Sequence, residues 1–570
     1  FASSLHAAQT QDCQKMTASQ CLCFCTIAIG LVVHVIGEEE EKEQPKVSPV
    51  EAAISVMLLG SIGFQMLLFY LVHWDDADIR RYAWRVISQT ISIFCAVLLF
   101  QGFNGLVEEY LIEGAGEFWE VIIDMGQMVF WLTAMQVMLA VTSGAVNELW
   151  GGTKPDMKVV EINVKSLALL LSHVAGFSAI NAWGSLQHVV FGQSPLIALL
   201  VVPLGMFGLI LVYHGFDIFR DYVSKSDDGV VDEYEEKWDD ETEECENDVA
   251  GLSLSFLTVQ AIRFAIGGLL PDTEGGESLS AMRNHGPSEW LVLLACGLGF
   301  GTLGMTLMHL DGMILEEDAD GWHFKKRVLN ISGDYFTFGN AWCLYYGVEW
   351  ALSSQLVGSE EALLHVIISL FLSAVAFLMI FVLDKVVDHG IVKEGSVAAV
   401  ETIILAFGVL IGFAWEQSFD AAVDVVADGL EERVPKVASK LLMSIVLVVI
   451  VFPAWRFYIL PLEQELAEYA QEEHHDKLRL KMAADQHYKL FLDQDSEDHA
   501  LDLAHLKMKQ HRRFAHGHGL PGGSHTDGVR HLQVTSKGIT EKITSKWNPE
   551  SRQRIKVAHS KTSEHLNLLM

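Results

Sequence analysis

Apolar residues in this chain occur in long blocks, and charged residues are concentrated in the segments between those blocks. A bilayer core about 30 Å thick requires roughly 20 consecutive apolar residues in a helix. Helices are expected because a single segment in lipid must satisfy its own backbone hydrogen bonds. Twelve blocks reach this length: 18–37, 50–74, 84–108, 119–143, 163–188, 195–220, 249–270, 289–310, 327–357, 362–388, 396–423 and 437–460.

The pattern therefore predicts an all-α polytopic membrane protein with about 12 transmembrane helices. Composition agrees, because 51% of the 570 residues are hydrophobic and the mean hydropathy is +0.28. The first block lacks the basic region and the small-residue cleavage site of a signal peptide, so we interpret it as a span. The chain begins with Phe1 rather than Met, and we expect the natural start to be either missing or processed.

Two groups of six helices share residues at matching positions. Residues 56–76 align without gaps with residues 292–312, and the polar, glycine and aromatic matches are Gly63 with Gly299, Phe64 with Phe300, His73 with His309 and Asp75 with Asp311. The third and ninth helices both begin with Arg-Val and end with Val-Glu. Since six is an even number, the sequence predicts two parallel repeats. Glycine permits close helix approach in lipid, so we expect Gly63 and Gly299 at helix contacts.

The repeat divides the chain into five segments. These are an N-terminal cytoplasmic segment (1–17), a first six-helix half (18–222), an acidic cytoplasmic linker (223–248), a second six-helix half (249–460), and a cytoplasmic charged helix with a His-rich disordered tail (461–570). Ser226–Asp248 holds thirteen acidic residues and one lysine. Such self-repelling composition predicts disorder in the linker, and the alternative is a cation-sensing or docking segment.

Basic residues indicate the orientation in the membrane, because cytoplasmic connections are enriched in them. The connections on the side of the N-terminus carry Arg80, Arg81, Arg85, Lys154, Lys158, Lys225, Lys237, Lys325, Lys326, Arg327, Lys385 and Lys393. The opposite connections carry only Lys42, Lys46, Arg283, Arg433, Lys436 and Lys440. We therefore expect both termini to be cytoplasmic. The type of membrane is not encoded in this pattern.

The net charge and the absence of known catalytic motifs limit which binding partners and activities are expected. A formal net charge of −34 argues against nucleic acid. The eight cysteines do not form a disulfide framework. No nucleotide-binding loop, zinc-protease motif or nucleophile elbow is present, so an enzyme is less expected than a transporter, and no cofactor or metal is specified. The expected partners are the lipid bilayer, a proton or small cation, and either a cytoplasmic protein or further copies of the chain.

The predicted architecture resembles that of major facilitator transporters and of the otopetrin proton channels, since twelve helices form two parallel six-helix halves. The Gly- and Arg-rich signature of the facilitators between helices two and three is absent, because residues 73–85 read HWDDADIRRYAWR. The resemblance therefore concerns architecture alone and implies no site residues.

Ionisable residues inside the predicted helices are the first candidates for a functional site. A charged group in the bilayer core costs roughly 2.5–3.5 kcal/mol on insertion scales, so its presence suggests a pathway or a pair. The deepest such residues are His173, Arg263, Asp334 and Glu401. Asp334 and Glu401 are the candidate partners of Arg263 by depth. The alternatives are a structural ion pair for Arg263 and a carbonyl hydrogen bond for His173.

A second set of candidates lies near the predicted membrane faces. Glu108, Glu349 and Glu416 form an outer acidic rim that would concentrate cations. The repeated residues His73, Asp75, His309 and Asp311 fall at the inner ends of the second and eighth helices. Interfacial capping is the alternative interpretation of both sets.

Three functions are compatible with these features. The favoured one is a transporter or channel for protons or small cations. The second is a non-transporting scaffold or sensory subunit that docks partners through its acidic linker and C-terminal tail. The third is a membrane-embedded lipid-modifying enzyme that uses the inner His and Asp positions.

Overall fold

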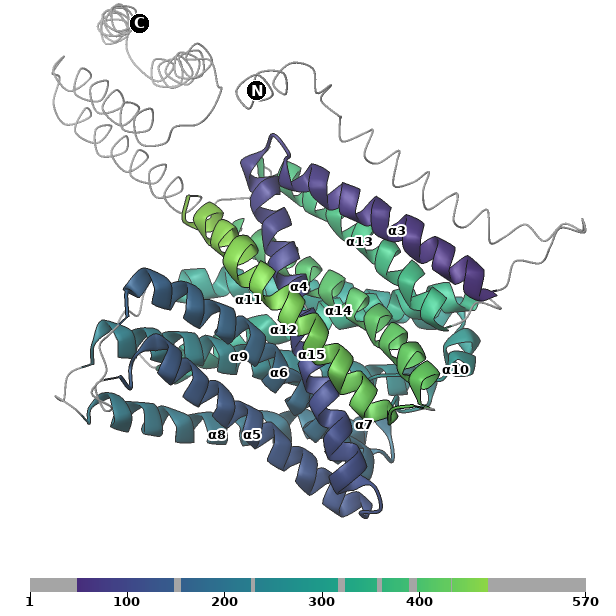
Figure 1. Ribbon diagram of the computed structural model, residues 1–570, viewed down its shortest axis with the longest axis horizontal. Coiled ribbons are helices and arrows are strands. Elements are labelled where there is room, and N and C mark those ends of the chain that lie inside the picture. The colour runs from purple at the N-terminus through teal and green to yellow at the C-terminus, as the bar shows by residue number, and fades with distance from the viewer. Residues whose placement is uncertain are drawn as a thin grey trace, which may run out of the picture. The chain divides into compact units, whose positions relative to one another are not determined.

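The computed structural model describes residues 49–147, 155–226, 231–315, 323–355, 361–388, 397–431 and 433–469, and these contain helices and no strand (Figure 1). The chain divides into two compact units, residues 1–465 and 466–570. The first block (18–37), the N-terminal segment (1–17) and almost all of the C-terminal segment lie outside the described residues. The long helices are α3 (Pro49–Val72), α4 (Ala77–Val107), α5 (Glu117–Ser143), α6 (Met157–Phe191), α8 (Val201–Ser224), α9 (Glu233–Gly267), α11 (Pro287–Leu315), α12 (His323–Gln355), α13 (Glu361–Asp388), α14 (Val397–Leu430) and α15 (Lys436–Ala454).

Shorter elements join these helices. They are α7 (Pro195–Ala198), α10 (Leu279–Asn284) and two π-helical turns, Glu108–Ile112 and Trp455–Ile459. Within the described residues, eight helices are long and apolar enough to cross a membrane. The prediction of an all-helical protein with membrane-spanning helices therefore agrees with the structure, whereas twelve spans and the two-repeat arrangement remain predictions.

Burial separates central helices from peripheral ones. In α9, 78% of the most apolar window is buried, compared with 28% in the α7–α8 segment and 11% in the segment that begins with α15. The exposed residues of α8 include Leu204 and Phe207, and those of α15 include Leu442 and Val449. Large apolar side chains on an outer helix surface suit contact with lipid. α9 therefore lies in the interior of the bundle, and α8 and α15 lie at its edge.

Neighbouring helices alternate in direction along the chain. α9 and α12 run parallel, because Gly251 contacts α12 at Asp334 and, further along both helices, Phe256 packs on Trp342 with ring centroids 5.1 Å apart. α11 runs antiparallel to α12, since Gly297 contacts Cys343. Further along α11, Gly304 contacts Phe336.

Glycine at the α11–α12 contact allows close helix approach, as expected for helices in lipid. The two repeated glycines behave differently. Among the described residues, no heavy atom of another element would lie within 4 Å of a Cβ at Gly63 or at Gly299. The described residues therefore show no close helix approach at this pair, and other glycines of α11 make such an approach.

The acidic segment before the seventh predicted span forms the first half of α9. Asp232 caps the helix by accepting hydrogen bonds from the backbone N–H groups of Tyr234 and Glu235, at 2.8 and 3.0 Å. Trp238 and Cys245 are buried on the inward side of this half. The prediction of disorder is therefore wrong for residues 233–248. The acidic composition of the segment does not reveal the basic side chains on other helices that pair with these acids.

Candidate functional site

The α14 cavity has a volume of about 410 Å³ and lies among α4, α6, α9, α12, α13, α14 and the connection that follows α9. Six acidic residues line it: Asp272, Glu274, Glu416, Asp420, Asp424 and Asp428. No lysine or arginine is part of this lining within the described residues. The cavity is therefore strongly electronegative, and clefts lined by one sign of charge raise the local concentration of the opposite ion.

Four of these acids form a ladder on α14. Glu416, Asp420, Asp424 and Asp428 recur every fourth residue, which places them on one helix face about 6 Å apart along the axis. Glu416 is 3% exposed, whereas the Asp428 side chain is 57% exposed. The ladder thus runs from the interior to the surface. Of these four acids, Glu416 alone was predicted from the sequence, although the four-residue spacing of acids beside an apolar stretch is a signal for the whole ladder.

Lysines from α15 pair with the exposed end of the ladder. Lys436 Nζ lies 2.6 Å from Asp428 Oδ1, and Lys440 forms an ion pair with Asp424. No comparable cation pairs with Glu416 among the described residues, and its single recorded hydrogen bond comes from Gln417 Nε2, at 2.9 Å from Glu416 Oε2. The buried end of the ladder therefore keeps a carboxylate that has no cationic partner in the described part of the chain.

A chain of buried polar groups continues from the cavity. His365 lines the cavity and is 6% exposed. Its Nδ1 lies 3.3 Å from the Tyr345 hydroxyl, and this hydroxyl lies 3.4 Å from Glu349 Oε1. A tyrosine hydroxyl has one proton and can also accept one, so the three groups can pass a proton between the cavity and a buried carboxylate.

Arg263 of α9 is fully buried and pairs with the connection that follows its own helix. Its Nη2 donates to Glu277 Oε1 at 2.6 Å, its Nη1 donates to the Gly275 carbonyl at 2.7 Å, and its guanidinium lies 3.6 Å from the Tyr346 ring centroid. Gly275 has a φ of +90°, which favours glycine. The expected partner Asp334 is therefore wrong, and the Glu401 side chain lies outside the described residues.

His285 fixes the same connection from the other side. Its Nε2 lies 3.1 Å from Glu277 Oε2, its Nδ1 lies 2.9 Å from Glu289 Oε2, and its ring stacks on Trp350 at 3.7 Å. Burial lowers the pKa of His285, but hydrogen bonds to Glu277 and Glu289 outweigh it and raise the pKa above its usual value. Burial raises the pKa of Glu277, yet His285 and Arg263 outweigh that effect and lower it.

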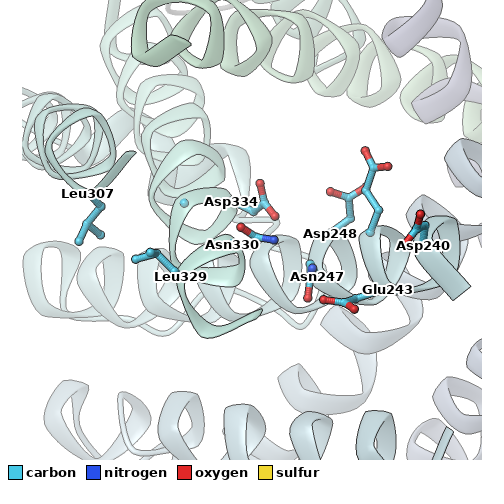
Figure 2. A pocket seen from close by; sticks show the side chains of 10 residues that line it. Asp240, Glu243, Asn247, Asp248, Leu307, Leu329, Asn330 and Asp334 are labelled. Atoms are coloured by element: carbon cyan, nitrogen blue, oxygen red, sulfur yellow. The ribbon is translucent and has the colours of Figure 1, made fainter. Parts of the chain in front are cut away.

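A second acidic hollow, the α9–α12 cavity, has a volume of about 390 Å³ (Figure 2). Its polar lining residues come from the acidic half of α9 and from the first half of α12, and they are Asp240, Glu243, Glu244, Asn247, Asp248, Asn330 and Asp334. Figure 2 shows Asn330 and Asp334 of α12 across from Asn247 and Asp248 of α9. Of the predicted pathway residues with described side chains, Asp334 is the one that lines either of these two cavities.

His173 lies apart from both cavities. Its Nδ1 is 2.6 Å from the Leu169 carbonyl oxygen on its own helix and 3.3 Å from Ser92 Oγ on α4. This agrees with the alternative of a histidine bonded to a neighbouring carbonyl. The structure therefore places His173, Arg263 and Asp334 in three separate environments rather than in one site.

The predicted outer rim is partly assembled. Glu416 lines the α14 cavity, and Glu349 is 4% exposed and connects to it through Tyr345 and His365. Glu108 lies at the exposed end of α4, where it accepts a hydrogen bond of 2.9 Å from Asn104, and it is not among the cavity residues.

The predicted inner positions show no shared site among the described side chains. His73 Nδ1 hydrogen bonds to the Phe69 carbonyl at 2.9 Å, and Asp75 is exposed. His309 and Asp311 lie in α11, but their side chains are outside the described residues. Nearby, Asp76, Asp78 and Asp384 place carboxylate oxygens within 4.8 Å of one another. Helix capping by Asp76 and an ion pair of Asp78 with Arg81 account for two of these three positions.

The Arg220 network is a buried polar cluster where α5, α8, α9 and α12 meet. Glu246 is 0% exposed and accepts hydrogen bonds from Arg220 Nη1 at 2.9 Å, from Gln136 Nε2 at 2.6 Å and from Arg327. Asp217 also pairs with both arginines. Arg327 was predicted as part of the repeat and of the cytoplasmic side, but not as a partner of Glu246, because no spacing rule connects residues more than eighty positions apart.

The fold and the cavities define a class: an all-helical protein whose long apolar helices fit an integral membrane protein. No protein-family model matches the chain, and no curated protein or solved structure matches it either. The function is therefore inferred from the residues of the cavities.

Proposed function

We propose that this protein is a multi-pass membrane transporter or channel for protons or small cations. The observation that supports it most strongly is the α14 cavity, whose acidic ladder leads from exposed Asp428 to buried Glu416 without a lysine or arginine in the described lining. Intramembrane carboxylates that face a cavity are typical of ion and proton pathways. Rings or rows of acids select for cations.

The position of the two cavities suggests the course of the pathway. On α9, Asp248 lines one cavity and Phe256 lines the other. On α12, Asp334 and Trp342 have the same relationship. Eight residues separate the members of each pair, which is about 12 Å along a helix. We expect a gate in the layer between the two cavities, because each cavity is hollow and is lined by acidic residues.

The proposal includes the finer architecture: twelve spans, two parallel six-helix halves, and cytoplasmic termini. Equivalent helix pairs support it, because α5 packs on α6 as α13 packs on α14, and α4 packs on α6 as α12 packs on α14. The α14 cavity is lined by α4 and α6 of one proposed half and by α9, α12, α13 and α14 of the other.

Flux measurements in proteoliposomes test this function. We expect the purified full chain to carry protons, read with a trapped pH-sensitive dye, or sodium or potassium ions, read with ion-sensitive dyes. Glu416→Gln removes the buried charge and keeps its shape. We expect it to reduce the flux at least about tenfold, the factor that corresponds to about 1.4 kcal/mol.

Glu117→Gln is the matched control, because Glu117 is an exposed acid in the first turn of α5 and does not line the cavity. We expect its flux to stay within about twofold of the unchanged protein. Flux that Glu416→Gln leaves unchanged would remove the ladder from the pathway. The scaffold function would instead be supported if the protein carried no ion at all and if a stable protein partner no longer bound after deletion of residues 463–570.

A further inference from the structure

The polar lining of the α9–α12 cavity consists of oxygen donors. Asp240, Glu243, Glu244, Asp248 and Asp334 contribute carboxylates, and Asn247 and Asn330 contribute amides. The other lining residues are Leu307, Leu329 and Gly333, so no basic, thiol or imidazole group is present in the described lining. Glu244 pairs with Lys165 at 3.1 Å. The other four carboxylates make no ion pair among the described residues.

Asn247 has an unmet hydrogen-bonding group at this cavity. Its side chain is 4% exposed, and its amide oxygen accepts no hydrogen bond from any described residue. A buried acceptor without a partner costs about 1–3 kcal/mol, so such groups usually hold an ion or a water molecule. This amide is an observation separate from the surrounding acids, and it favours an electropositive ligand.

The helix geometry limits how many donors one ion can contact. Asp240 and Asp248 are eight residues apart, or about 12 Å along α9, which is too far for shared coordination. Asn330 and Asp334 are four residues apart on one face of α12, and they lie across from Asn247 and Asp248 (Figure 2). The charges of Asp248 and Asp334 act on one another, so a cation between them would relieve their repulsion.

We propose that Asn247, Asp248, Asn330 and Asp334 form a binding site for a divalent cation of the calcium class. Hard divalent cations take carboxylate and amide oxygens, and calcium accepts six to eight oxygens at about 2.3–2.6 Å in flexible geometry, with water in the remaining positions. Zinc and copper prefer nitrogen and sulfur ligands, which this lining lacks. A monovalent ion would leave one of the two facing carboxylate charges uncompensated. Asp240 and Glu243 attract the ion from outside the coordination sphere.

This site goes beyond the transport function and does not depend on it, because it rests on the contact between α9 and α12 alone. Calcium binding with no ion flux would leave the site standing and contradict the transport proposal. Flux without calcium binding would do the reverse.

Equilibrium dialysis of the full chain in detergent against radioactive calcium ions tests the site. We expect saturable binding of about one ion per chain, and we expect Asp248→Asn and Asp334→Asn each to weaken it at least about tenfold by removing a charged ligand. Glu236→Gln is the matched control, because Glu236 is an exposed acid of α9 outside the lining, and we expect its affinity to change less than about twofold.

Folding is checked by the elution profile of each variant, and Asn247→Ala replaces either aspartate variant that fails to fold. We expect calcium to raise the melting temperature of the unchanged protein but not that of the site variants. Non-saturable binding, binding that survives both aspartate substitutions, or equal displacement by magnesium or potassium ions at the same concentration would overturn the proposal.

Discussion

Glu246 offers the sharpest test of how this bundle is held together. It is fully buried and receives hydrogen bonds from two arginines and from Gln136. Glu246→Gln keeps the shape of the side chain but removes its charge. Among the described acids, Arg220 then keeps Asp217 and Asp239, whose side chains are 38% and 56% exposed, and Arg327 keeps Asp217. Removing one partner of a buried ion pair costs about 3–5 kcal/mol, and we expect a loss of this size.

The sequence supplies a control two residues away. Glu244 has a side chain that is 61% exposed, and it pairs with Lys165. Exposed ion pairs contribute about 0–1 kcal/mol, so Glu244→Gln should have a small effect. The free energy of unfolding is measured by titrating the purified protein in mixed micelles with a denaturing detergent and following helical circular dichroism.

A double-mutant cycle of Glu246→Gln with Arg327→Gln then isolates the pairwise term, which we expect to exceed about 1 kcal/mol. The reasoning is refuted if Glu246→Gln costs no more than Glu244→Gln. It is also refuted if the two substitutions at Glu246 and Arg327 are simply additive.

Two further predictions concern packing and pH. A Cβ at Gly251 would lie 2.5 Å from Asp334 Cβ and 3.1 Å from the α12 backbone, so we expect Gly251→Ala to lower the free energy of unfolding by about 1–3 kcal/mol. Gly299→Ala is the control and should cost no stability, because no described atom of another element lies within 4 Å of the added Cβ. Equal melting temperatures of the two variants would contradict this prediction. The raised pKa of His285 means that its protonated form stabilises the connection after α9, and this stability is complete below pH 6.5 and is lost as the pH rises through the raised value. We expect the melting temperature to fall over that interval in the unchanged protein but not in His285→Phe, which keeps the ring on Trp350; parallel pH profiles would contradict this role.

Much of the helical framework could be predicted from the blocks of apolar residues. The block at 119–143 corresponds to α5 (Glu117–Ser143), and the block at 362–388 corresponds to α13 (Glu361–Asp388). Such agreement is expected, because length and hydropathy alone determine where a helix can cross lipid. The block at 249–270 began too late for α9 (Glu233–Gly267), since residues 233–248 are polar and are stabilised by partners on other helices.

The candidate site was less predictable than the helices, because it depends on contacts between elements that are distant in the sequence. Glu416 was predicted as part of the outer acidic rim near a membrane face, and Asp334 was predicted from its depth in an apolar block. Glu277 was missed as the partner of Arg263, because it lies in a connection and its approach depends on the turn at Gly275. The link from His365 through Tyr345 to Glu349 joins α13 and α12, and no local spacing predicts a contact between two helices.

The ladder on α14 depends on helical phase as much as on charge. Each residue advances about 100° around a helix, and four residues return nearly to the same direction. Inserting one alanine between Glu416 and Asp420 would therefore turn Asp420, Asp424 and Asp428 by about 100° away from the cavity while leaving the amino-acid composition of the helix almost unchanged. Length changes in α14 should consequently be much less tolerated than exchanges of Asp for Glu at the same positions, and related chains that keep this cavity should conserve the spacing of the acids more strictly than their identity.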